Sequence, residues 1–169
     1  MIQRSTHHID NRAGWRLALH RWIDPKAHDP SRPPVVMVPG YAMNSFILGY
    51  HPKARGIAPY LAARGFEVWA TDLRGQGHSE STGGSRRYRL EDVGLVDLAC
   101  ALDAIAERCE GGHAQADLIG CSLGATYMLM HAAWWPEPRA RRLVNLGGPL
   151  RWTHAHPLVK GLSAAPLLW

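Results

Sequence analysis

The residues most capable of chemistry form a serine turn, Gly120-Cys121-Ser122-Leu123-Gly124. A short apolar run precedes this turn at residues 116–119 and a helix-like stretch follows it at residues 123–133, which predicts a strand, a sharp turn and a helix. A serine at such a turn is held in a strained conformation that exposes its hydroxyl at the edge of a sheet. Ser122 is therefore a candidate nucleophile. The alternative is a glycine-rich turn whose serine takes part in no reaction.

Negative charge that develops beside Ser122 would need hydrogen-bond donors, and two backbone N–H groups are candidates. The N–H of Leu123 stands at the first helical position, where the helix itself supplies no acceptor. The N–H of Tyr41 follows Gly40, which comes just after the apolar run at residues 35–38 and permits a close backbone approach. We predict that these two amides form an oxyanion hole.

A third segment, Asp72-Leu73-Arg74-Gly75-Gln76-Gly77-His78-Ser79, follows an apolar run at residues 66–71. Its glycines and opposite charges predict a sharp surface turn in which Asp72 pairs with Arg74. We interpret this pair as structural rather than catalytic.

Strand and helix patterns alternate along the chain from residue 35 onward. Short apolar or β-branched runs predict a hairpin and then four strands, at residues 5–9, 16–22, 35–38, 66–71, 116–119 and 142–146. Helices are predicted between them, at residues 57–64, 95–109 and 123–133. Because parallel strands need crossover connections, this order predicts an α/β fold, a mostly parallel sheet with helices on both faces. The three segments described above would then meet at the carboxyl edge of the sheet.

The helix predicted from residue 95 has the clearest amphipathic pattern. Its apolar positions recur every three or four residues, at Leu95, Leu98, Leu102, Ile105 and Cys109. Charged residues occupy the other face, at Asp97, Asp103, Glu107 and Arg108. We therefore expect Asp97 on the polar side of this helix.

Together, the glycine-containing loop, the Asp-x-Arg-Gly-x-Gly-x-Ser turn and the serine turn resemble the α/β-hydrolase superfamily, in the family's order and over nearly the whole chain. The resemblance implies that Ser122 is the nucleophile, that the N–H groups of Tyr41 and Leu123 line the oxyanion hole, and that no metal or organic cofactor is required. Dehalogenases and epoxide hydrolases of this family use Asp as the nucleophile, so Ser122 favours a serine esterase or lipase that acts on a small acyl or ester substrate. The apolar tail and the lack of a charged pocket suggest an apolar acyl group.

Serine chemistry also needs a base and an orienting acid, which the family places after the nucleophile. Glu137 is the only later carboxylate, and a helix of about 11 residues would put it roughly 16 Å from the turn. His131 is expected to pack or cap within its helix, whereas His154 and His156 lie on the correct side of the sheet but no acid follows them. The sequence thus predicts a fold truncated after about the sixth strand, with its base and acid beyond Trp169.

This interpretation divides the chain into a hydrolase core at residues 1–150 and an apolar tail at residues 151–169, which resembles the start of a cap or lid. Two alternatives remain open. The chain could be a non-catalytic hydrolase domain that acts by binding or association. The thiol of Cys121 could also react, although it stands one residue early and we interpret it as a packed core thiol.

Composition excludes several other classes of protein. The net charge is +5 and the pI about 9.4, but the basic residues are spread along the chain and accompany no nucleic-acid motif. The chain contains no run of about 18 apolar residues and no signal-peptide pattern. Three scattered cysteines do not suggest a disulfide framework or a zinc site. These features favour a cytoplasmic protein whose oligomeric state stays open.

Overall fold

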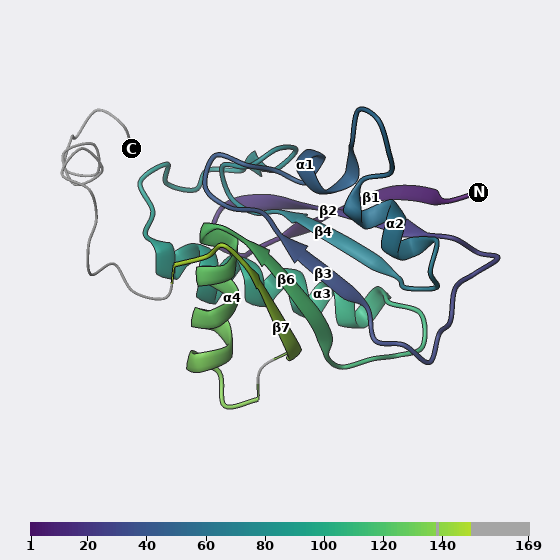
Figure 1. Cartoon of the computed structure of the whole chain (residues 1–169). Helices are drawn as coiled ribbons and strands as arrows, with labels where there is room; N and C mark the ends of the chain where they lie inside the picture. Colours follow the sequence, from purple (N-terminus) through teal and green to yellow (C-terminus); the bar gives the residue numbers. More distant parts are fainter. Residues whose placement is uncertain (138, 150–169) are drawn as a thin grey trace.

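A computed structural model describes residues 1–137 and 139–149, which build a seven-stranded sheet flanked by helices (Figure 1). The strands are β1 (Gln3–Asp10), β2 (Trp15–Ile23), β3 (Val35–Val38), β4 (Val68–Asp72), β5 (Glu80–Ser81), β6 (Ala116–Cys121) and β7 (Ala140–Leu146). The helices are α1 (Phe46–Gly49), α2 (Ile57–Ala62), the π-helix η1 (Asp92–Asp97), α3 (Leu98–Arg108) and α4 (Leu123–Trp134). All strands and helices expected from the sequence are present, whereas the short α1 and β5 were not predicted.

The strand order is β1-β2-β4-β3-β6-β7, and β5 pairs with β2 outside this path. β1, β2 and β4 are antiparallel neighbours, whereas β4, β3, β6 and β7 run parallel to one another. The predicted α/β architecture is confirmed. Because β3 lies between β4 and β6, the loops that follow these three strands are neighbours at one edge of the sheet.

Alternation along β3 explains why both faces of the sheet are covered. Val36 and Val38 belong to a buried cluster that includes residues of η1, α3 and α4. Val35 and Met37 point the other way, into a cluster that includes residues of α1 and α2. Figure 1 shows the two helix groups on opposite sides of the sheet.

The helical segment predicted from residue 95 begins earlier and has a different polar face. The π-helix η1 leads directly into α3, and Leu98, Leu102 and Ile105 are buried as the pattern predicts. Asp97 does not face solvent, however, because its exposed fraction is 0%. The expectation for Asp97 is therefore wrong, and the reason is a buried ion pair described below.

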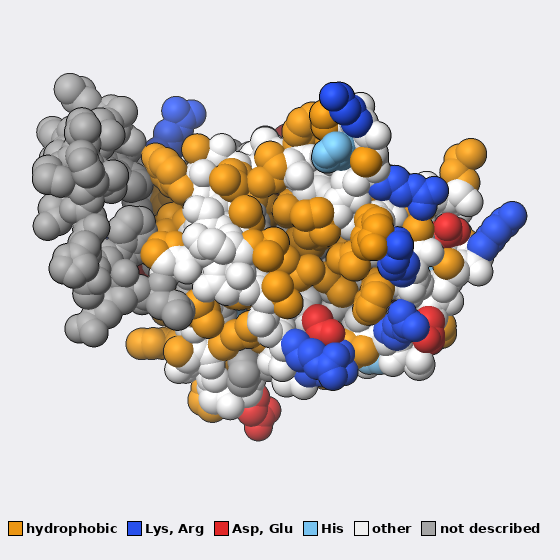
Figure 2. Space-filling view, viewed as in Figure 1, with side chains coloured by type: hydrophobic (Ala, Val, Ile, Leu, Met, Phe, Trp, Pro, Cys, Tyr) orange, Lys and Arg blue, Asp and Glu red, His pale blue; other side chains and the backbone are white. Residues whose placement is uncertain are grey.

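Hydrophobic side chains cover much of the face viewed in Figure 2, where α1, α2 and β7 are exposed. Exposed large hydrophobic residues in or next to these elements are Phe46, Ile47, Tyr50, Ile57, Tyr60, Leu143, Val144 and Leu146. Among the described residues, no helix combines the length and the apolar character needed to cross a membrane. The proposed tail at residues 151–169, with His154 and His156, lies outside the described residues.

Candidate active site

Ser122 connects the end of β6 to the start of α4, as its sequence context predicts. Its φ is 52° and its ψ −124°, a conformation that costs a non-glycine residue on the order of 1–3 kcal/mol. Two hydrogen bonds hold it: the N–H of Ser122 donates to the carbonyl of Leu146 at 2.9 Å, and the N–H of Ala125 donates to the carbonyl of Ser122 at 3.0 Å. The surrounding strand and helix thus maintain a strained serine turn.

The glycines beside Ser122 are needed for close packing. A Cβ on Gly120 would collide with the backbone of Ala125, and a Cβ on Gly124 would collide with the carbonyl of Val38. The start of α4 therefore lies directly against the end of β3. Ser122 is half-buried, and its hydroxyl has no hydrogen-bond partner within residues 1–137 and 139–149.

The loop after β3 contacts the serine turn through Gly40. A Cβ on Gly40 would lie 2.9 Å from the Cβ of Ser122 and 3.3 Å from the nitrogen of Leu123. The next peptide belongs to Tyr41, a residue that is 53% exposed. The structure therefore brings Ser122, Leu123 and the Gly40–Tyr41 peptide together at the carboxyl edge of the sheet.

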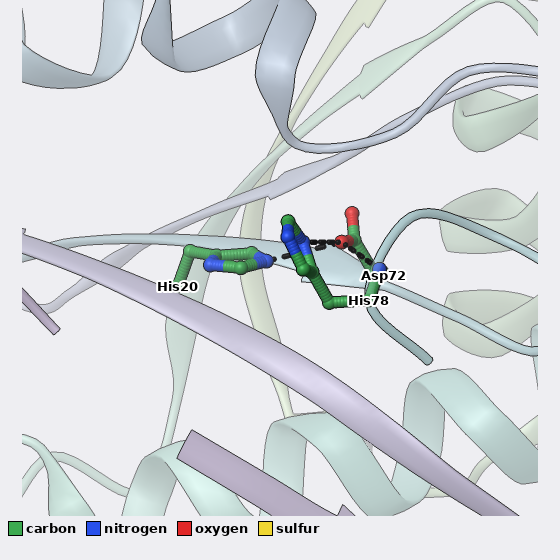
Figure 3. Close-up of side chains that lie close together, drawn as sticks. All are labelled: His20, Asp72 and His78. Carbon is green, nitrogen blue, oxygen red and sulfur yellow. Dashed lines mark hydrogen bonds and ion pairs between the residues drawn. The ribbon is translucent and has the colours of Figure 1, made fainter. Parts of the chain in front are cut away.

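The turn after β4 does not contain the predicted ion pair between Asp72 and Arg74. Asp72 is fully buried, and its Oδ2 instead lies 3.0 Å from Nε2 of His20 and accepts the N–H of His78 at 2.9 Å. Its Oδ1 accepts the N–H of Ser45 at 2.7 Å. Figure 3 shows His20, from β2, and His78 converging on this carboxylate. Asp72 therefore joins β2, β4 and the loop after β3.

These partners keep Asp72 ionised. Burial alone would raise its pKa, but hydrogen bonds from His20, His78 and Ser45 outweigh burial and lower the pKa to about 2. The ligand atoms of His20, Asp72 and His78 lie within 4.8 Å of one another, close enough to surround a metal ion. Asp72 and the ring of His20 already have protein partners, since Nδ1 of His20 lies 2.9 Å from Oγ1 of Thr6. Hydrogen bonding thus accounts for the cluster as it stands.

Arg74 pairs with Asp97 rather than with Asp72. Its Nε and Nη2 each donate to an Asp97 carboxylate oxygen at 2.7 Å, and its backbone N–H donates to the same carboxylate at 3.1 Å. Nδ2 of Asn11 adds a fourth hydrogen bond at 2.6 Å. This buried, bidentate pair explains why Asp97 turns inward and ties η1 to the turn after β4.

A cavity of about 810 Å³ lies beside the loop after β3. Its walls come from that loop, the turn after β4, the segment before η1 and α4, and include Tyr41, Ala42, Gln76, Tyr88 and Tyr127. Burial raises the pKa of Tyr127 to about 12, so this phenol stays neutral. Ser122 is not among the described residues that line the cavity.

The cavity is rich in positive charge. Arg74, Arg86, Arg87 and Arg89 line it together with one carboxylate, Asp92. Arg74 is neutralised by Asp97, whereas the other three form no salt bridge with any residue in the described part of the chain. The expectation that the chain lacks a charged pocket is therefore wrong, because the arginines of a surface loop converge on the cavity wall.

None of the remaining candidates forms a hydrogen bond with the Ser122 hydroxyl among the described residues. His131 is buried in α4, and its ring nitrogens have no hydrogen-bond partner among the described residues, so it packs as predicted. Glu137 is exposed beyond the end of α4. Cys121 carries a free thiol that is half-buried at the end of β6 rather than in the core. The described residues therefore place Ser122 beside backbone amides but beside no histidine or acid that could activate it.

Sequence comparison identifies the family of the chain. A family model described as the alpha/beta hydrolase fold matches residues 33–165. The chain belongs to the alpha/beta hydrolase family. No curated protein is significantly similar to it in sequence.

The fold of this alpha/beta hydrolase is similar to the solved structures of enzymes of several kinds. An epoxide hydrolase from Vigna radiata is 20% identical, with a TM-score of 0.65 over 89% of this chain and 39% of its own. A thioesterase domain from the curacin biosynthetic pathway is 22% identical, with a TM-score of 0.61 over 95% and 52%. A membrane phospholipase A, titled a bacterial virulence factor, is 18% identical, with a TM-score of 0.67 over 96% and 45%. These likenesses show the fold, and the chain spans about half or less of each of the three.

Sequence reasoning missed three features of the site. It did not find the His20–Asp72 contact, the buried pair of Asp97 with Arg74 or the hydrogen bond from Gln76 to Gly40. Gln76 lies within the segment already singled out, but nothing in its local pattern indicated a partner 36 residues away. Each of these contacts joins segments that are far apart in the sequence and that only the fold brings together.

Proposed function

We propose that the chain carries the nucleophile of a serine hydrolase that cleaves carboxylic esters through an acyl-enzyme. The Ser122 oxygen attacks the ester carbonyl while a base takes the hydroxyl proton. The bond to the alcohol then breaks, the alcohol leaves with that proton, and water releases the acid in a second step. The N–H groups of Tyr41 and Leu123 stabilise the oxyanion of each tetrahedral intermediate.

The observation that carries this proposal is the backbone of Ser122. Its φ of 52° is strained, and packing that tolerates only glycine at positions 120 and 124 maintains it. Backbone strain of this kind persists only where the surrounding structure holds the residue in place, and it occurs most often at functional sites. A turn with no chemical role would gain stability from a glycine at position 122, because glycine adopts positive φ without cost.

Two observations bear on the substrate. Similarity to a thioesterase domain and to a phospholipase A agrees with acyl chemistry, and a serine at the turn favours it over the Asp chemistry of epoxide hydrolases. The cavity lined by Arg86, Arg87 and Arg89 favours an ester that also carries an anionic group, such as a carboxylate or a phosphate. This replaces the purely apolar acyl substrate expected from the sequence.

Proton transfer is the incomplete part of the site. Because no described histidine forms a hydrogen bond with Ser122, the proposal assigns the base and its acid to residues outside 1–137 and 139–149. The competing proposal is a non-catalytic domain that acts by binding. The absence of a base and an acid beside Ser122 among the described residues favours this alternative.

A fluorophosphonate probe separates the two proposals. It is applied to this chain and to the longest open reading frame that contains it, each with Ser122→Ala and with Ser31→Ala, an exposed serine that serves as the matched control. We expect labelling of the longer protein that Ser122→Ala abolishes and Ser31→Ala leaves unchanged. If the longer protein is labelled no more than its Ser122→Ala variant, the serine hydrolase proposal is refuted and the proposal of a non-catalytic binding domain is favoured.

A further inference from the structure

The side chain of Gln76 is fixed at both ends of its amide. Its Oε1 accepts the N–H of Leu73 at 3.0 Å, and its Nε2 donates to the carbonyl of Gly40 at 2.9 Å. Its backbone is held as well, because its N–H donates to the Leu73 carbonyl and its own carbonyl accepts the N–H of Ser79, both at 2.9 Å. One amide end faces a donor and the other an acceptor, so only one orientation of the amide satisfies both.

This side chain anchors the peptide that carries the proposed oxyanion donor. The carbonyl of Gly40 accepts two hydrogen bonds, one from Gln76 and a longer one, at 3.2 Å, from the N–H of Met43. The Gly40–Tyr41 peptide is trans, so its carbonyl and its N–H point in opposite directions. A restraint on the Gly40 carbonyl therefore also sets the direction of the Tyr41 N–H.

The strand order supplies that direction. Gln76 lies in the turn after β4, Gly40 follows β3, and Ser122 follows β6, with β3 between the other two strands. A Gly40 carbonyl held toward the β4 side leaves the Tyr41 N–H toward the β6 side. The close approach of Gly40 to Ser122 and Leu123 places this peptide against the serine turn.

We infer that Gln76 is a positioning residue that fixes the Gly40–Tyr41 peptide with its N–H toward Ser122. The catalytic meaning of this inference rests on the proposed function, since an oriented amide matters to the reaction only if Ser122 is the nucleophile. The anchoring itself does not depend on any reaction, so it can be tested separately.

A backbone NMR experiment tests the anchoring. Glycine precedes tyrosine only twice in the sequence, at Gly40–Tyr41 and Gly49–Tyr50, so [1-¹³C]glycine and [¹⁵N]tyrosine labelling gives two carbonyl–amide cross-peaks. Tyr50→Phe removes one and assigns both. The test variant is Gln76→Glu, which keeps the size and the acceptor for Leu73 but sets a carboxylate oxygen against the Gly40 carbonyl. Gln3→Glu, at an exposed position, is the control for added charge.

We expect Gln76→Glu to move the Gly40–Tyr41 cross-peak, with its carbonyl ¹³C frequency lowered by loss of the hydrogen bond, while the Gly49–Tyr50 cross-peak stays in place. Gln76→Ala gives the same pattern, and Gln3→Glu moves neither cross-peak. An unmoved Gly40–Tyr41 cross-peak overturns the inference. So does an equal movement of both cross-peaks, because the substitution would then act through the whole fold.

Kinetics of the longer protein test the catalytic consequence. Removing one oxyanion donor costs on the order of 10²- to 10³-fold in kcat, so a misdirected donor in Gln76→Glu should lower kcat by up to about 10²-fold with little change in KM. A raised KM with unchanged kcat would assign Gln76 to substrate binding and overturn positioning. If Ser122 proves unreactive, the proposed function fails, whereas the NMR result still decides whether Gln76 anchors the peptide.

Discussion

Replacing Asp97 with asparagine should destabilise the fold severely. Asp97 is fully buried and accepts four hydrogen bonds, three of them from Arg74 and one from Asn11. Asparagine keeps the shape of the side chain but removes the charge, so the Arg74 guanidinium would be left buried without a counter-ion. Breaking a buried pair in this way costs about 3–5 kcal/mol, which is a large part of the roughly 5–15 kcal/mol that stabilises a typical domain.

The exposed pair between Arg141 and Asp117 provides a matched control. It has nearly the same bidentate geometry, at 2.9 and 2.7 Å, but lies on the surface between β6 and β7. Because water screens this pair, Asp117→Asn should cost far less than Asp97→Asn. Urea unfolding of both variants, followed by tryptophan fluorescence and by circular dichroism, gives the two losses in free energy of unfolding.

A double variant separates charge burial from packing. Arg74→Met with Asp97→Leu removes both charges, so it should be less destabilising than the sum of the two single substitutions. The reasoning fails if Asp97→Asn costs no more than Asp117→Asn. It also fails if the double variant shows no coupling between the two positions.

Three further outcomes follow from the site. Burial lowers the pKa of His131, so as the pH drops below about 6.5 the unfolded state takes up a proton before the folded state does, and the stability of the fold should fall. Urea unfolding midpoints measured over roughly pH 5 to 8 should show this fall in the unsubstituted protein but not in His131→Leu. Gly124→Ala drives a Cβ into a β3 carbonyl and should cost about 1–3 kcal/mol by urea unfolding, with loss of fluorophosphonate labelling; unchanged labelling would contradict the packing argument. Replacing Arg86, Arg87 and Arg89 by glutamine should lower kcat/KM of the longer protein for a succinate monoester and spare the neutral butyrate ester; an equal loss for both esters would remove the anion-binding role.

The sequence predicts most of the fold because the relevant signals are local. The four residues of β3 are an unbroken apolar run, and the structure buries all of them. The serine turn is equally local, since its strain and its glycines belong to five consecutive residues. Neither α1, with four residues, nor β5, with two, is long enough to give a periodic pattern.

Buried polar contacts are the part that the sequence does not predict. Arg74 and Asp97 are 23 residues apart, and His20 and Asp72 are 52 apart, so no local window contains both partners. Helical periodicity alone assigns Asp97 to the polar face, because the pattern treats every charged residue as exposed and contains no information on distant partners such as Arg74. The incorrect Asp72–Arg74 pair has the same origin, since proximity in sequence suggested an ion pair, whereas in the fold Asp72 hydrogen-bonds to His20 and Arg74 pairs with Asp97.

The turn after β4 therefore has a larger role than the surface turn expected from the sequence. Asp72 holds the N–H of Ser45, and Gln76 holds the carbonyl of Gly40, so both restrain the loop after β3. On its other side, Arg74 holds Asp97 at the end of η1. None of these side chains forms a hydrogen bond with Ser122, yet together they fix the loop against which the serine turn packs. Substitutions in this turn should thus change the reactivity of Ser122 through the position of the backbone rather than through any direct contact.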